Sequence, residues 1–123
     1  MKKFLIMSIF ASLTTIFGCS AKGFVSVSAS EFATEIAKEG VQLVDVRTAS
    51  EYAEGHIPGA VNIDVFSSDF AEKISALDKE RTVALYCRSG RRSKSAGEVA
   101  VKQGFKVVEL DGGIISWRGE IER

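Results

Sequence analysis

The sequence predicts an α/β fold, a mostly parallel sheet with helices on both faces, and three observations support this. Short apolar runs rich in β-branched residues alternate with helical segments of about ten residues. Two of these runs, 41–46 and 82–86, are apolar almost throughout, which is typical of strands buried on both faces. The length of 123 residues and the hydrophobic content of 46% suit one globular domain, and a formal net charge of zero gives no field that attracts nucleic acid.

The domain is expected to begin with a strand, a helix and a second strand. Residues 24–27 form a short strand candidate. Ser28 and Glu31 then match a capping box, which opens a helix that runs to about Lys38. The apolar run 41–46 follows as a buried parallel strand.

A second capping box opens the next unit. Thr48 and Glu51 have the same spacing as the first pair, and the short helix that they begin stops by Gly55. A short strand at 60–63 follows this helix. The unit therefore repeats the strand and helix alternation that the fold class requires.

The second half continues the alternation and ends in a short helix. Residues 70–77 and 93–103 have helical patterns, while 82–86 and 106–110 have strand patterns. A last helix is expected at 114–117. Sites in parallel sheets form at the carboxyl ends of strands, so the loop after 82–86 is the candidate site.

The N-terminus has the pattern of a secretory signal. Lys2 and Lys3 precede an uncharged stretch from Phe4 to Phe17, which is shorter than the roughly 20 residues that span a bilayer. The residues around Cys19 resemble a bacterial lipoprotein box, in which a cysteine is lipidated and becomes the new N-terminus. We therefore expect a signal peptide over 1–18.

This interpretation places the folded domain, residues 24–122, outside the cytoplasm. We expect export to the periplasmic face of a bacterial membrane, with a lipid anchor as the only contact with the bilayer. Three alternatives stay open: cleavage after Ala21, an uncleaved membrane anchor, or a buried helix. Phe17 departs from the lipoprotein pattern, which has a smaller residue there.

Cys87 is the candidate reactive residue. The chain has two cysteines, so a lipidated or removed Cys19 leaves Cys87 as the one mature thiol, and an internal disulfide is excluded. A lone thiol of this kind is either an inert buried residue or a reactive one.

The loop after Cys87 has the features that stabilise a thiolate. Arg88, Arg91, Arg92 and Lys94 bring four positive charges close together, and cations favour the ionised form of cysteine. A helix expected from near residue 93 directs its free N–H groups at the loop. Taken singly, each feature also fits a solvated basic face or a small core cysteine; their combination indicates a cradle for an anionic sulfur or oxyanion.

Three motifs resemble those of the rhodaneses, the sulfurtransferase family. Cys87, Gly90 and Arg92 match the pattern Cys-x-x-Gly-x-Arg. The stretch 45–63, with Asp-Val-Arg at its start and Gly-His-Ile-Pro-Gly within it, resembles the N-terminal signature of the family. Gly-Gly-Ile and a tryptophan within 112–117 resemble the C-terminal one, so the resemblance covers about residues 24–120.

The resemblance implies a fold, a reaction and a set of site residues. It implies a five-stranded parallel sheet and a cysteine that takes sulfane sulfur, as a persulfide, from thiosulfate or a similar anionic donor. The sulfur then passes to cyanide or another thiophilic acceptor such as a thiol, without a cofactor or a metal, and we expect a monomer. Cys87 is the expected nucleophile, and the expected substrate-binding residues are Arg88, Ser89, Gly90, Arg91 and Arg92.

Other residues of the signatures are expected to support the structure. Asp45 and Arg47 follow a buried strand, and a salt bridge with Glu51 or with the Cys87 loop is the preferred interpretation. His56 is the one histidine of the chain, and we do not expect it to take part in catalysis. Trp117 is expected to be a packing residue.

Two other functions compete with turnover of small sulfur donors. Cysteine phosphatases and arsenate reductases also place a cysteine in an anion cradle, but phosphatases use Cys-x5-Arg, and here Arg92 gives Cys-x4-Arg. The second is a persulfide carrier or sensing module that exchanges sulfur with a redox or sulfur-carrier protein. The sequence does not separate a carrier from an enzyme, because both use Cys87.

Overall fold

The computed structural model describes residues 23–123. The expected signal peptide at 1–18 and the lipidated Cys19 lie outside these residues. Within the described part of the chain, no helix combines the length and the apolar character needed to cross a membrane.

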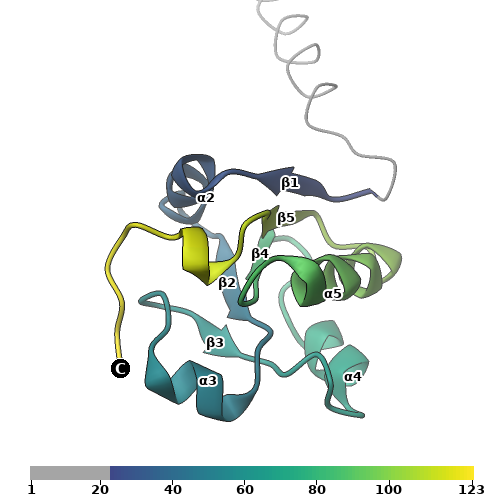
Figure 1. Cartoon of the computed structure of the whole chain (residues 1–123). Helices are drawn as coiled ribbons and strands as arrows, with labels where there is room; N and C mark the ends of the chain where they lie inside the picture. The colour runs from purple at the N-terminus through teal and green to yellow at the C-terminus, as the bar shows by residue number, and fades with distance from the viewer. Residues whose placement is uncertain (1–22) are drawn as a thin grey trace, which may run out of the picture.

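One five-stranded sheet runs through the molecule, and every strand pair in it is parallel. The strand order is β1-β5-β4-β2-β3 (Figure 1). The strands are β1 (Val25–Val27), β2 (Gln42–Asp45), β3 (Val61–Asn62), β4 (Val83–Tyr86) and β5 (Val107–Leu110). The α/β class and the five parallel strands are thus confirmed, and all carboxyl ends lie at one edge.

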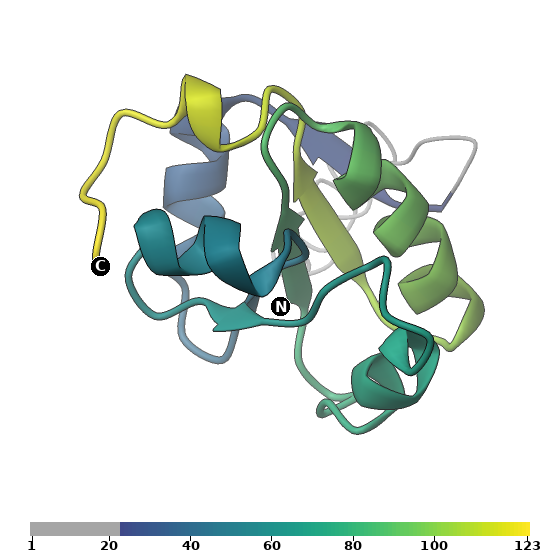
Figure 2. The same cartoon turned by 60° about the horizontal axis from the view of Figure 1, so that its bottom comes forward.

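Helices cover both faces of this sheet, as expected. Figures 1 and 2 show α4 (Phe70–Ser75) and α5 (Arg91–Lys102) on one side, with α2 (Ala29–Ile36) and α3 (Ala49–Glu54) on the other. A 3₁₀ turn, η1 (Ile114–Ser116), stands where the sequence predicts the last helix.

The core divides into two clusters because successive strand residues point to opposite faces. Leu85 and Cys87 join the cluster that packs against Ala96 of α5. Tyr86, between them, joins the other cluster and meets Phe32 of α2 edge to face. The period-2 alternation of β4 therefore places the sulfur of Cys87 on the α5 side.

Both predicted capping boxes are present. The Ser28 hydroxyl accepts from the Glu31 N–H, and the Thr48 hydroxyl accepts from the Glu51 N–H. In each case the glutamate carboxylate accepts from the backbone N–H of the capping residue, so both helices begin where the sequence places them.

Helix α5 begins two residues earlier than expected, at Arg91 instead of Ser93. Gly90 precedes it with φ +105°, a left-handed conformation that turns the chain directly into the helix. Arg91 and Arg92 thus belong to the first turn of α5, and this first turn lies against the sulfur.

Candidate active site

Cys87 follows β4 at the carboxyl edge of the sheet and is 1% exposed. The turn η1 is hydrogen-bonded to the backbone of the Cys87 loop. The Ile114 N–H donates to the Cys87 carbonyl at 2.9 Å, and the Ile115 N–H donates to the Arg88 carbonyl at 3.2 Å. A side chain at Gly113 would meet the Arg88 carbonyl at 2.1 Å. Gly113 of the Gly-Gly motif therefore lets η1 approach the loop closely.

Two backbone N–H groups of the loop donate to the sulfur. The Gly90 N–H lies 3.1 Å from Cys87 Sγ, and the Ser93 N–H lies 3.3 Å from it. Both come from the start of α5, where N–H groups have no helical acceptor and the helix dipole favours negative charge. The cradle expected from sequence is therefore present around Sγ, with Ser93 as one of its donors.

Gly90 is required at the centre of this cradle. Besides its positive φ, a Cβ atom there would lie 1.9 Å from the Asp111 carbonyl oxygen. No side chain fits without a shift of the backbone, so the bare glycine allows the loop to close around the sulfur.

The three arginines of the loop have different roles in this structure. Arg88 and Arg91 are exposed, and neither makes an ion pair with any residue that the structure describes. Arg92 instead donates to both oxygens of Glu51 at 2.8 and 2.9 Å, which joins the first turn of α5 to α3. Its role in substrate binding stays a prediction, and in the resting structure it is a bridge between helices.

This bidentate pair changes the ionisation of both partners. The Arg92 guanidinium lowers the pKa of Glu51 to about 2, and desolvation only partly opposes the shift. The hydrogen bonds that Arg92 donates to Glu51 in turn raise the pKa of Arg92. The pair is therefore charged on both sides over the whole physiological pH range.

Asp45 and Arg47 pair with each other, which differs from the expected bridge to Glu51 or to the loop. Arg47 Nη2 lies 2.7 Å from Asp45 Oδ2 and 2.7 Å from the Gly55 carbonyl. Burial disfavours the Arg47 charge, but Asp45 outweighs it and the pKa of Arg47 is raised. The expected Glu51 partner is taken by Arg92, and the Asp45–Arg47 pair fixes the chain after β2.

His56 lies in a structural setting. Its ring stacks on Tyr52 with centroids 3.7 Å apart, and its Nδ1 contacts the Tyr52 carbonyl at 2.9 Å. Its Nε2 faces Glu122 at 3.4 Å. None of these partners belongs to the Cys87 loop, in line with the non-catalytic interpretation.

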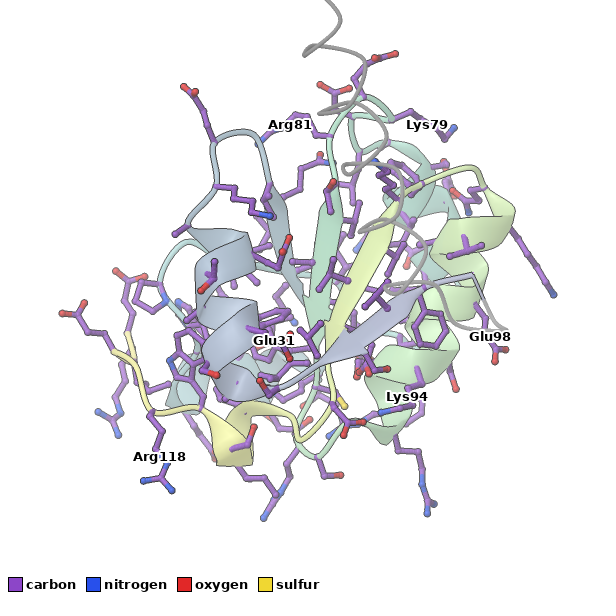
Figure 3. All side chains as sticks on the ribbon, turned by 90° about the horizontal axis from the view of Figure 1, so that it is seen from above. Glu31, Lys79, Arg81, Lys94, Glu98 and Arg118 are labelled. Atoms are coloured by element: carbon purple, nitrogen blue, oxygen red, sulfur yellow. The ribbon has the colours of Figure 1, made fainter. Side chains whose placement is uncertain are left out.

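Sequence reasoning missed a buried polar cluster next to the sulfur. Ser93 Oγ lies 3.5 Å from Cys87 Sγ and donates to Glu109 Oε2 at 2.5 Å. Glu109 is fully buried in β5, and Lys94 Nζ lies 3.0 Å from its Oε1. Figure 3 labels Lys94, whose side chain reaches back from α5 toward the edge of the sheet. The sequence signal that could have revealed this cluster is Glu109, a single acidic residue within an otherwise apolar strand.

The sequence model of the rhodanese-like domain matches residues 28–120. This chain belongs to the rhodanese family. YtwF of Bacillus subtilis is 44% identical over 84 residues, which cover 68% of this chain and 80% of the relative. The thiosulfate sulfurtransferase GlpE of Pseudomonas aeruginosa is 38% identical over 91 residues, which cover 73% and 81%.

Solved structures agree with this assignment. A rhodanese-related protein from Thermoplasma volcanium superposes with a TM-score of 0.70 and 29% identity, covering 79% of this chain and 96% of that one. A rhodanese-like domain protein from Staphylococcus aureus gives 0.69 and 29%, covering 79% and 95%. Relatives of this chain thus include proteins named as sulfurtransferases, and the fold is that of their family.

Proposed function

We propose that this rhodanese carries sulfane sulfur as a persulfide on Cys87, from thiosulfate or a similar anionic donor to cyanide or a thiol. The observation that carries the proposal is the pair of N–H groups, from Gly90 and Ser93, that donate to Cys87 Sγ at the start of α5. Such donors stabilise negative charge on sulfur. A thiol that is already ionised needs no separate base to activate it.

The proposed cycle has two balanced steps. The Cys87 thiolate attacks the sulfane sulfur of thiosulfate, the S–S bond of the donor breaks, and sulfite leaves with the bonding electron pair. Cyanide or a thiolate then attacks the outer sulfur of the persulfide, and the Cys87 thiolate leaves. Each step transfers one sulfur atom, and negative charge is conserved, so neither a metal nor a redox cofactor enters the cycle.

We propose that Arg88 and Arg91 attract the anionic sulfur donor. Both are exposed beside the buried sulfur, and thiosulfate carries two negative charges. Replacing both by alanine is expected to lower the rate of loading at low salt about tenfold, whereas Arg118→Ala, an exposed arginine after η1, leaves the rate unchanged.

The first test is the intact mass of the full chain after incubation with thiosulfate under conditions free of reducing agent. One added sulfur atom is expected, and it is lost again on addition of cyanide. Cys87→Ser abolishes the addition, whereas Cys19→Ser retains it. An unchanged mass with a free Cys87 thiol contradicts the proposal, and stoichiometric loading without thiocyanate turnover makes the protein a carrier instead of an enzyme.

We also propose that residues 1–18 are a lipoprotein-type signal peptide and that Cys19 is lipidated, with the domain at the periplasmic face of a membrane. The support is the sequence pattern described above. Expression in a bacterial host with a labelled fatty acid tests it. The label is expected on the wild-type chain and absent from Cys19→Ser, and a label that persists in this variant refutes the proposal.

A further inference from the structure

Glu109 is a buried acid that the proposed cycle does not use. It is fully buried in β5, where a charge is unfavourable unless donors surround it. Three donors do so: the hydroxyls of Ser26 and Ser93, each at 2.5 Å, and the ammonium of Lys94 at 3.0 Å. The carboxylate thus connects β1, β5 and the first turn of α5.

The hydroxyl of Ser93 lies between Glu109 and the sulfur. A hydroxyl has one proton, and here the acceptors in reach are Glu109 Oε2 at 2.5 Å and the Gly90 carbonyl at 3.1 Å. The proton of Ser93 is therefore directed away from Cys87, and a lone pair faces Sγ at 3.5 Å. In this orientation the hydroxyl accepts from a thiol but does not donate to a thiolate.

A thiolate at Cys87 without bound sulfur therefore has two unfavourable neighbours. One is the lone pair of the Ser93 hydroxyl, and the other is the Glu109 carboxylate, which lies beyond that hydroxyl. Formation of a persulfide moves the formal negative charge from Sγ, the atom that faces the Ser93 hydroxyl, to a second sulfur atom. The N–H groups of Gly90 and Ser93 continue to hold Sγ. The buried acid thus disfavours the empty state more than the loaded state.

We propose that Glu109 is a positioning residue that biases Cys87 toward the sulfur-loaded state. It acts by fixing the Ser93 hydroxyl with its proton away from Sγ and by its own charge. The effect on loading rests on the proposed function, whereas the effect on ionisation of the thiol does not.

Other charged groups near the sulfur have partners apart from Glu109. Arg92 of α5 interacts electrostatically with Cys87 and is held by Glu51 of α3. Lys94 of α5 keeps its contact with Asp111, which follows β5, at 2.8 Å. Glu109→Gln therefore removes the one negative charge that Ser93 connects to the sulfur.

The decisive experiment is the rate of Cys87 alkylation by iodoacetamide against pH, in the Cys19→Ser background. Glu109→Gln is expected to lower the midpoint of this profile by about one pH unit, because the thiolate loses a like charge and gains a hydroxyl donor. Glu39→Gln, an exposed carboxylate at the amino end of the sheet, is the matched control and leaves the midpoint unchanged. An unchanged or raised midpoint in Glu109→Gln overturns the proposal. A raised midpoint would mean that Glu109 favours the thiolate by accepting the thiol proton.

Two further variants identify the route. Ser93→Ala removes the lone pair that faces Sγ and the link to Glu109, so the midpoint is expected to fall slightly, and Glu109→Gln has a smaller effect in that background. A midpoint raised by Ser93→Ala alone contradicts the orientation. If Glu109→Gln does not fold, Lys94→Gln tests the same charge: its side chain is 39% exposed, and losing its ammonium is expected to raise the midpoint.

The loading bias is measured as the fraction of persulfide, by intact mass, at fixed ratios of thiosulfate to sulfite. At a pH where Cys87 is ionised in both proteins, Glu109→Gln is expected to lower the loading constant about fivefold to tenfold. An unchanged constant refutes the bias. A wild-type chain that never loads refutes the proposed function alone, because the alkylation profile still reports on Glu109.

Discussion

Glu51→Gln is the substitution that tests how the loop is held. In the wild type, both oxygens of Glu51 accept from Arg92, and Oε1 also accepts from Thr48 in the capping box. A glutamine keeps an oxygen for Thr48 but loses the charge. The variant thus removes the ion pair between α3 and α5 and leaves Arg92 one neutral acceptor, while the helix cap stays in place.

The magnitude follows from the ionisation of the pair. A pKa lowered from 4.5 to about 2 corresponds to roughly 3 kcal/mol at full conversion. The two side chains are 20% and 26% exposed, so solvent screening reduces this to about 1–2 kcal/mol. For a domain of this size, the melting temperature is expected to fall by about 5–10 °C.

The assay is urea denaturation of both proteins from pH 7 to pH 3. The folded-state pKa of Glu51 lies below its unfolded value, so the wild type has its full advantage above about pH 4.5 and loses it as pH falls toward 2. Thr48→Ala serves as comparison: it removes a hydroxyl that also donates to Glu51 but keeps the ion pair, so its loss of stability should depend less on pH than that of Glu51→Gln. Equal stabilities at pH 7, or a gap that persists unchanged at pH 3, would refute the reasoning.

Two other substitutions probe the backbone around the site. Gly90→Ala would bring a Cβ within 1.9 Å of the Asp111 carbonyl oxygen. We therefore expect the free energy of unfolding, measured by urea denaturation, to fall by at least about 2 kcal/mol, and thiosulfate loading to be strongly reduced. Normal loading would show that the loop closes differently. Tyr86→Phe leaves the buried Ile57 N–H without its acceptor, at a cost of about 1–3 kcal/mol. Because burial raises the pKa of Tyr86, the phenol stays neutral and this cost should be the same at pH 6 and pH 9.

What the sequence predicted correctly depends on short-range patterns. Each capping box is a contact over three residues, and the alternation along 82–86 determines which face each side chain occupies. Cys87 could be singled out because its neighbours in the chain are also its neighbours in space. Local chemistry of this kind can be read without a structure.

What the sequence did not reveal depends on contacts between distant segments. Glu51 lies 41 residues from Arg92, and Ser26 lies 83 residues from Glu109, so neither pair leaves a spacing pattern. The start of α5 was placed late because the left-handed conformation of Gly90 depends on its packing against Asp111. These contacts are set by how the strands are ordered in the sheet.

The parallel sheet also determines which way the site faces. Gly23 precedes the amino end of β1, whereas Cys87 follows the carboxyl end of β4, and β5 joins these two strands in parallel. A chain tethered through Cys19, as we propose, therefore presents Arg88 and Arg91 to the side opposite its anchor. Four-residue strands are about 13 Å long, more than the Debye length of about 8 Å at physiological salt. Anionic lipid headgroups beneath the domain would thus hardly repel thiosulfate that approaches the loop from solution.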